Sequence, residues 1–255
     1  MLKKPFKAFH SAIESEMVAS IGEYVLVPQG PVVSPVLSEA VALWIQKVTK
    51  RCMDMVFAFI FLLSALPLFL LIGIAIKLTS PGPIFFRQPR VGYKGKVFKI
   101  WKFRTMYVDQ SAEEEHKAYV ESLIQNEEGL PGEVLAEKFV EYLDKRVTKV
   151  GRFLRMSSLD ELPQLLNVLW GDMSLVGPRP HPPYEVQAYK KWYARRLQVK
   201  PGLTGWSKLN LRLTPLNYEE SILYDLWYVD NWNILLDLRI LIMTIPFILS
   251  MKHAT

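Results

Sequence analysis

The stretch Ser157-Ser158-Leu159-Asp160-Glu161-Leu162-Pro163-Gln164 places two carboxylates side by side at the start of a predicted helix, and Gly177-Pro178-Arg179-Pro180 follows that helix. Leucines recur here at helical spacing and mark one buried face: Leu159, Leu162, Leu165, Leu166 and Leu169. Two adjacent acids repel each other, so the pair favours a site that uses the charge. A metal ion, a phosphate bound through a metal, or a proton transfer would each use it.

Two starts are compatible with this helix. Ser158 and Glu161 fit an S-x-x-E capping box, but Pro163 then lies just past the first turn, where its missing N–H begins to matter. A start at Asp160 places Pro163 within the first turn. Both starts predict that free helix N–H groups keep the Asp160 carboxylate ionised. An ordinary acidic first turn, with one acid as the cap, explains the Asp-Glu pair without any chemistry.

Basic residues surround the acid pair in the sequence. Arg155 precedes Asp160 by five residues, and Arg179 stands between two prolines that stiffen its backbone. Arginine is always charged and can hold a phosphate through two hydrogen bonds at once. A structural salt bridge is the alternative for each arginine. Arg146 and Arg152 also lie just upstream, and of these four or more cations we expect at least two to bind a diphosphate.

A hairpin is predicted upstream, with strands at 84–86 and 97–103 and a turn at 92–95. Four cations lie on or beside it: Arg87, Arg90, Lys102 and Arg104. A solvated strand face would account for them. Phosphate binding is the competing interpretation.

The apolar run at 55–76 contains 22 residues, which is long enough to cross a bilayer. Pro67 lies near its middle, where it breaks a backbone hydrogen bond, and Ser64 is placed to bond the backbone freed there. Basic residues flank both ends, so the positive-inside rule places both ends in the cytoplasm. A kinked, re-entrant helix satisfies these observations, and a plain transmembrane span is the alternative.

The remaining segments carry weaker signals. Residues 1–46 form an N-terminal extension of unknown role, 47–79 the membrane segment, and 80–255 a cytosolic domain with a helical insertion at about 107–146. The apolar stretch 233–251 includes Asp237 and Arg239, which are costly in lipid, so we expect an interfacial helix or one buried against the domain. His181, just after the Pro-Arg-Pro corner, is expected at the surface, and a place near the site is the alternative.

Composition narrows the classes of partner. The 255 residues include 31 Lys and Arg against 25 Asp and Glu, and 50% are hydrophobic. A basic and apolar chain without Lys/Arg runs favours an anionic membrane surface and argues against nucleic acid. The single cysteine, Cys52, cannot form an internal disulfide. The sequence has no Asp-x-Asp motif, no P-loop and no paired-histidine zinc motif.

An ordered set of motifs resembles a known family. Beside Ser158 to Pro180 they are Phe86-Arg87-Gln88-Pro89-Arg90-Val91-Gly92, Lys102-Phe103-Arg104-Thr105-Met106, Lys200-Pro201-Gly202-Leu203-Thr204-Gly205-Trp206 and Asp225-Leu226-Trp227-Tyr228-Val229. Together they resemble the bacterial sugar transferases, the monotopic polyprenyl-phosphate phosphoglycosyl transferases, of the type that initiates exopolysaccharides. The resemblance runs from about Lys47 to the C-terminus.

The resemblance implies an α+β, mostly helical fold. One re-entrant membrane helix, broken at Ser64 and Pro67, would carry a small mixed α/β catalytic domain with amphipathic interfacial helices on the cytoplasmic face of the bacterial inner membrane. It also implies transfer of a sugar-1-phosphate from a UDP-sugar to undecaprenyl phosphate, with UMP released. A homo-oligomer and other glycan-assembly enzymes are candidate protein partners.

Roles in the site follow from the same resemblance. Asp160 would be the nucleophile that forms a covalent phosphosugar, and Glu161 would hold Mg²⁺ with Asp160 or act as a base. Arg155 and Arg179 would bind phosphate, with Lys102, Arg104, Arg87 and Arg90 as further candidates.

Two features bear on the substrate and on rival functions. After Gly205 the family usually has Trp-Gln-Val and Gly-Arg, whereas this chain reads Trp206-Ser207-Lys208-Leu209-Asn210-Leu211-Arg212. The insertion and the stretch Pro182-Pro183-Tyr184-Glu185 resemble the family members that initiate exopolysaccharides with hexose donors, which implies glucose or galactose. The rival functions are a non-catalytic membrane adaptor and a polyprenyl diphosphate phosphatase.

Overall fold

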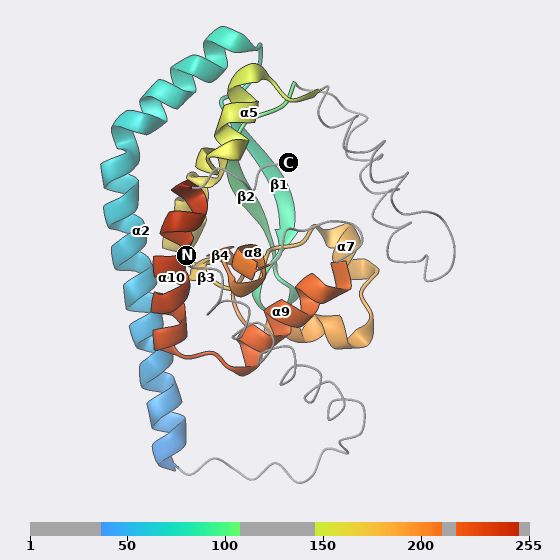
Figure 1. The fold of residues 1–255 in the computed structure, drawn as a ribbon. Coiled ribbons are helices and arrows are strands. Elements are labelled where there is room, and N and C mark those ends of the chain that lie inside the picture. The colour runs from blue at the N-terminus through green and yellow to red at the C-terminus, as the bar shows by residue number, and fades with distance from the viewer. Residues whose placement is uncertain (1–36, 108–145, 211–217, 250–255) are drawn as a thin grey trace, which may run out of the picture. The chain divides into compact units, whose positions relative to one another are not determined.

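A computed structural model describes residues 37–107, 146–210 and 218–249 (Figure 1). The chain divides into two units, Met1–Ile45 and Gln46–Thr255. The second unit holds every motif discussed above. Most of the predicted N-terminal extension and of the insertion at 107–146 lies outside the described residues.

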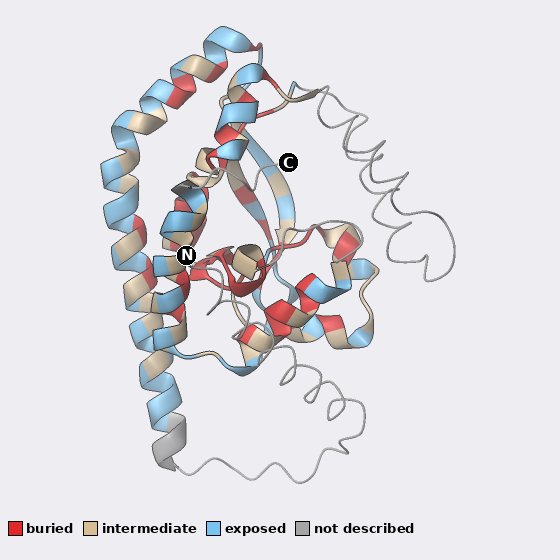
Figure 2. Ribbon diagram, in the orientation of Figure 1, coloured by how far each residue is buried: buried red, intermediate tan, exposed pale blue. Residues whose placement is uncertain are grey.

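Helix α2, Leu37–Thr79, is the long apolar helix. From Val41 to Thr79 it is long and apolar enough to cross a membrane, and few of its side chains are buried (Figure 2). The helix continues through Pro67 and bends in its second half (Figure 1). The Ser64 hydroxyl donates to the Phe61 carbonyl at 3.0 Å, so the expectation that it bonds the carbonyl freed by the proline is wrong. Re-entry by one face stays a prediction.

The predicted hairpin is confirmed. Strand β1, Phe85–Val91, pairs antiparallel with β2, Val97–Phe103, and a short 3-10 turn, η1 (Tyr93–Gly95), joins them. Alternating apolar residues build β2: Phe98, Ile100 and Phe103 are buried. Phe86 pairs with Lys102, which places this lysine at the end of the hairpin far from the turn.

The acid pair lies on a 3-10 turn between two helices, and here the predicted helix start is wrong. Helix α5, Lys149–Met156, is followed by η2, Leu159–Glu161, and then by α6, Gln164–Trp170. Ser158 adopts a left-handed conformation (φ 56°) and makes no side-chain cap, so no capping box forms. Pro163 is itself the N-cap residue of α6. A proline tolerates that position because it lacks an N–H to leave unpaired.

A second, parallel sheet joins β3, Ser174–Val176, to β4, Gly202–Thr204. The two backbones approach closely: a Cβ at Gly202 would lie 2.1 Å from the Gly177 nitrogen, so only glycine fits. Along the chain, the connection from β3 to β4 contains α7, Pro183–Gln187, and η3, Lys191–Gln198. After β4 come α8, Trp206–Asn210, α9, Tyr218–Asp230, and α10, Ile234–Leu249. The described residues therefore form a mostly helical α+β fold, as predicted.

One hydrophobic cluster joins α2 to the acid turn, which is the η2 turn that carries Asp160 and Glu161. Ile72 and Ile76 of α2 pack with Phe103 and Leu154. Leu159 and Leu162, the residues on either side of the acid pair, pack against the same cluster. The acid turn is thereby fixed to the end of α2.

A buried polar network joins α2 to the C-terminal helix. Lys50 contacts Asp54 at 3.4 Å and Asp237 at 2.7 Å. Asp54 accepts the Leu175 N–H, and Asp237 accepts hydrogen bonds from Tyr228. Lys50, Asp54, Asp237 and Tyr228 are named the anchor cluster below. It confirms, for Asp237, the alternative in which this segment is buried against the domain, since Asp237 is fully buried.

Candidate active site

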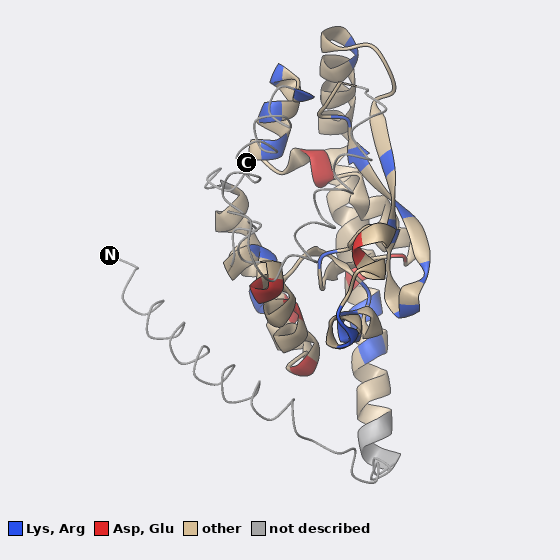
Figure 3. Cartoon of the chain, turned by 90° about the vertical axis from the view of Figure 1, so that its right-hand side faces the viewer, with Lys and Arg blue, Asp and Glu red and all other residues tan. Residues whose placement is uncertain are grey.

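Asp160 and Glu161 project from η2 into a group of cations. Asp160 is 8% exposed. The Lys102 amine lies 3.7 Å from an Asp160 oxygen and 3.0 Å from a Glu161 oxygen. The end of the hairpin therefore brings one lysine to both acids. Basic residues recur along both strands of the hairpin (Figure 3).

Lys208 is a site residue that the sequence did not identify. Its amine lies 2.5 Å from the second Glu161 oxygen and also donates to the Leu203 carbonyl at 3.2 Å. Lys208 stands on α8, 47 residues from Glu161. The only sequence feature that could have drawn attention to Lys208 is its place in the stretch after Gly205, which departs from the family pattern. Glu161 is thus held between lysines from two separate elements.

The two neighbouring acids have opposite electrostatics. Burial raises the pKa of Asp160, against the lowering effect of Lys102. Burial also acts to raise the pKa of Glu161, but Lys102 and Lys208 outweigh it and hold that pKa well below the ordinary value. The expectation that helix N–H groups keep Asp160 readily ionised is therefore wrong, because no α-helix begins there and desolvation dominates.

Two arginines complete the cationic surroundings. Arg155, on α5, donates from Nε to the Thr105 hydroxyl at 3.2 Å, and its charge acts to lower the pKa of Asp160. Arg179 acts in the same direction on Glu161. Lys102 and Lys208 thus contact the two carboxylates, and Arg155 and Arg179 add positive charge that acts on them from farther away. Such an excess suits an anionic ligand.

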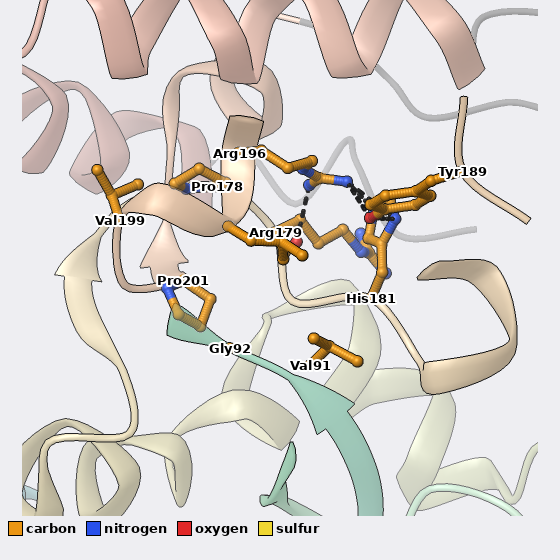
Figure 4. A pocket seen from close by; sticks show the side chains of 10 residues that line it. Val91, Gly92, Pro178, Arg179, His181, Tyr189, Arg196, Val199 and Pro201 are labelled. Atoms are coloured by element: carbon orange, nitrogen blue, oxygen red, sulfur yellow. Dashed lines mark hydrogen bonds between the residues drawn. The ribbon is translucent and has the colours of Figure 1, made fainter. Parts of the chain in front are cut away.

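The Pro-Arg-Pro corner is held by its carbonyl oxygens. Two of its residues lack an N–H, so an ordinary ladder cannot fix it. The Pro178 carbonyl accepts the Gly202 N–H at 2.9 Å and the Arg179 carbonyl accepts an Arg196 nitrogen at 2.8 Å (Figure 4). The Pro180 carbonyl accepts an Arg90 nitrogen at 3.2 Å, and the next carbonyl accepts the Val91 N–H at 2.8 Å. All four successive carbonyls have a donor.

The other predicted phosphate-binding arginines make different contacts. Arg104 donates to the carbonyls of Ser80 and Pro81, which closes the turn after α2. Arg87 lies over the Trp101 ring, 4.0 Å from its centroid. Arg90 supports the Pro-Arg-Pro corner as described, and burial and Arg179 lower its pKa. The structure does not place any of these three in contact with the acid pair.

His181 is buried, which corrects the expectation of a surface residue. Its ring contacts the hydroxyls of Tyr189 at 2.8 Å and Tyr218 at 3.1 Å. Arg196 approaches the same ring at 2.9 Å. Burial, followed by the charge of Arg196, lowers the pKa of His181 well below its ordinary value, so the ring is neutral at physiological pH. His181 belongs to the support behind the corner.

The acid pair can take part in a metal site but cannot build one alone. Among the described residues, no group of three or more His, Cys, Asp or Glu side chains could hold a metal ion. Mg²⁺ often binds through one or two carboxylates together with substrate phosphates and water. Asp160 and Glu161 therefore fit an ion that arrives with a diphosphate.

Comparison with known proteins identifies the family. A family model described as bacterial sugar transferase matches residues 45–251. The chain belongs to the bacterial sugar transferase family. The match covers the apolar helix, the hairpin, the acid turn and the Pro-Arg-Pro corner, and it confirms the resemblance drawn from their motifs.

Three relatives illustrate the family. The sugar transferase chain is 40% identical over 208 residues to the UDP-glucose:undecaprenyl-phosphate glucose-1-phosphate transferase of Escherichia coli (strain K12), covering 79% of this chain and 40% of that protein. It is 42% identical over 203 residues to the uncharacterized sugar transferase EpsL of Bacillus subtilis (strain 168), covering 79% and 88%. It is 39% identical over 168 residues to the galactosyl transferase CpsE of Streptococcus agalactiae, covering 66% and 35%. This sugar transferase spans only about two fifths of the length of the E. coli protein.

Proposed function

We propose that this protein transfers a sugar-1-phosphate from a UDP-hexose to undecaprenyl phosphate and releases UMP, as the first step in building an exopolysaccharide or another surface glycan. The observation that carries the proposal is the acid turn itself. Its carboxylates contact two lysines within the field of two arginines, and its flanking leucines pack on the end of an apolar helix. A phosphate-bearing lipid substrate needs both features at one place. The names of the relatives support the same substrates.

In the proposed first step, an Asp160 oxygen attacks the sugar-proximal phosphorus of the donor. The bond from that phosphorus to the bridging oxygen breaks, and UMP leaves with the electron pair. Burial raises the pKa of Asp160, so the nearby Lys102 and Arg155 have to favour the ionised carboxylate. Arg179 would offset charge on the phosphoryl oxygens. A magnesium ion bound with the diphosphate would screen the like charges of the donor and the acids.

In the second step, an oxygen of the lipid phosphate attacks the phosphorus of the aspartyl phosphosugar and releases the Asp160 carboxylate. The product is a polyprenyl-diphospho-sugar. Glu161, kept ionised by Lys102 and Lys208, would help hold the metal or act as the base toward the lipid phosphate. Splitting one transfer between two anions into two displacements makes each step easier.

A panel of nucleotide sugars tests this function. Membranes that contain the protein should release UMP from a UDP-hexose over many turnovers only when undecaprenyl phosphate is present. Release of inorganic phosphate from a polyprenyl diphosphate would instead identify a phosphatase, and neither product would identify an adaptor. The same panel distinguishes glucose from galactose. Activity should disappear in excess chelator and return with magnesium; full activity in chelator would exclude the metal role.

We also propose that α2 is re-entrant and that the protein works on the cytoplasmic face of the bacterial inner membrane. Pro67 and the basic residues at both ends of the apolar run support this topology. Single cysteines placed near Lys47 and near Lys77, in a Cys52→Ser background, should both react only from the cytoplasmic side. Labelling of one end from outside would show a true span.

A further inference from the structure

A buried ion pair contacts the segments that carry Arg179 and Lys208. Arg196, on η3, is 2% exposed and contacts the Asp225 carboxylate on α9. The same guanidinium donates to the Arg179 carbonyl at 2.8 Å and to the Tyr189 hydroxyl at 2.9 Å. Figure 4 shows Arg196 bridging from the corner to the Tyr189 and His181 side. One rigid side chain therefore joins the corner to two other elements.

Asp225 also reaches the second cation-bearing segment. One of its oxygens faces Arg196, and the other accepts the Ser207 hydroxyl at 2.6 Å. Ser207 is the neighbour of Lys208, whose amine contacts Glu161. The segments that carry Arg179 and Lys208 are thus both fixed to one buried carboxylate, although neither Arg196 nor Asp225 contacts the acid pair.

We propose that Arg196 is a positioning residue for the transfer reaction: backed by Asp225, it fixes the Arg179 main chain and so directs the Arg179 side chain toward the phosphoryl group. Asp225 fixes α8, and with it Lys208, in the same way. The inference rests on the proposed function, because its effect is measured as the rate of that transfer reaction. The guanidinium fork is essential to it, because a lysine amine cannot span Asp225 and the Arg179 carbonyl with the same geometry.

The main test is Arg196→Lys, which keeps a positive charge beside Asp225 and loses the second arm. We expect kcat to fall about tenfold to a hundredfold, because small misplacements of a group that acts in the transition state are costly. The KM for the UDP-sugar should change much less. The thermal midpoint should fall modestly, because the Arg179 carbonyl loses a donor, so kcat is compared per folded molecule. A wild-type kcat in this variant would overturn the inference.

Arg195→Lys is the matched control. Arg195 is the neighbouring residue on η3 and forms an ion pair with Asp230 at the surface. The same substitution there should leave kcat and KM unchanged. An equal loss in both variants would mean that η3 is merely sensitive to substitution, and the proposed role of Arg196 would be wrong.

A double-mutant cycle tests whether Arg196 acts through Arg179. If it does, adding Arg196→Lys to Arg179→Ala should cause little further loss, because the side chain to be directed is already gone. Multiplication of the two losses would show that Arg196 acts elsewhere and would overturn the proposal. Should Arg196→Lys fail to fold, Arg196→Met combined with Asp225→Leu removes both charges together, and its kcat should fall to the same level. Wild-type kcat in that pair would also reject the positioning role.

Failure of the proposed function is a separate outcome. If the wild type releases UMP but Arg196→Lys is fully active, the positioning role fails and the transferase function stands. If the wild type releases no UMP from any donor, the function fails. In that case the cycle is measured by calorimetric binding of UDP with magnesium. Arg179→Ala should weaken this binding, Arg196→Lys should weaken it by no more than the small factor expected for KM, and combining them should cause no loss beyond that of Arg179→Ala. Multiplied losses would overturn the inference.

Discussion

Two clusters in this protein join lysines to carboxylates, and they differ in charge balance. In the anchor cluster, Lys50 lies between Asp54 and Asp237, and backbone, tyrosine and tryptophan donors supply the remaining hydrogen bonds. Its acids outnumber its cations, and both acids are almost completely buried. In the acid turn, two partly exposed lysines contact two carboxylates, and the charges of Arg155 and Arg179 act on the same acids in addition. The anchor cluster is complete without a ligand, whereas the acid turn has positive charge to offer an anion.

The difference between the two clusters should be clearest for a substitution at Asp160. Asp160→Asn should reduce turnover by at least roughly a thousandfold, because it removes the proposed nucleophile. The wild type mixed with labelled donor and no lipid should retain sugar-phosphate on the peptide that holds Asp160, with a UMP burst that does not exceed the amount of enzyme. Intersecting initial-rate plots without a trapped label would mean direct transfer, with Asp160 only a metal ligand.

At Asp237 the expected loss is in stability. Asp237→Asn removes the closest anionic partner of the half-buried Lys50, which keeps Asp54, and should cost about 1–3 kcal/mol of unfolding free energy. Thermal unfolding in detergent measures this loss. The kcat per folded molecule should stay near that of the wild type. A selective loss of kcat with normal stability would show that the anchor cluster is part of the site.

Arg179→Lys separates charge from geometry within the site. Activity should fall on the order of tenfold, since lysine cannot reproduce the two-pronged grip on a phosphate. Stability should hardly change, because the main chain of the corner keeps its donors from Gly202, Arg196, Arg90 and Val91. Initial rates and a thermal scan on the same sample provide the measurement. Full activity would reduce Arg179 to a general source of charge.

The smallest effect concerns the pH dependence of stability at the two acids. Burial raises the pKa of Asp160, so its contribution to stability is present at low pH and is lost as the pH rises through the raised pKa. The lysines lower the pKa of Glu161, so its contribution is present above the ordinary glutamate pKa and is lost as the pH falls toward the lowered pKa.

In metal-free buffer at pH 8, Asp160→Asn should therefore raise the thermal midpoint and Glu161→Gln should lower it. Both differences should shrink when the pH falls below the ordinary carboxyl range. Shifts of the same sign at pH 8 would contradict the opposite electrostatics of the two acids.

Local patterns predicted much of the fold. Alternation identified the hairpin, leucine spacing identified the α6 region, and hydropathy identified the apolar helix, because each pattern lies within one element. The capping box failed because Ser158 takes a left-handed backbone and Pro163 begins the helix instead. The S-x-x-E sequence is present, but the chain forms a 3-10 turn before Pro163 instead of an α-helix that starts at Ser158.

The site was only partly predictable for a related reason. Asp160, Glu161 and Arg179 were found because family motifs mark them. Lys208 contacts Glu161, which is 47 residues away in the sequence, and Arg196 contacts Asp225, which is 29 residues away. Local sequence patterns do not predict contacts between residues so far apart in the chain. His181 was misplaced because partners from several distant segments bury it. The ionisation of Asp160 depends on burial, which spacing alone does not reveal.

The packing of Leu159 and Leu162 on the end of α2 has a consequence for how an acceptor would meet the acids. With α2 in a bilayer as proposed, the acid turn could not rise or sink independently of that helix, so its depth would be set once, at insertion. A lipid phosphate travelling in the membrane plane is confined to a nearly constant depth as well. Under the proposed function, their encounter would therefore be a search over a surface instead of a volume, and capture would depend on lateral diffusion and on the amount of acceptor per area of membrane.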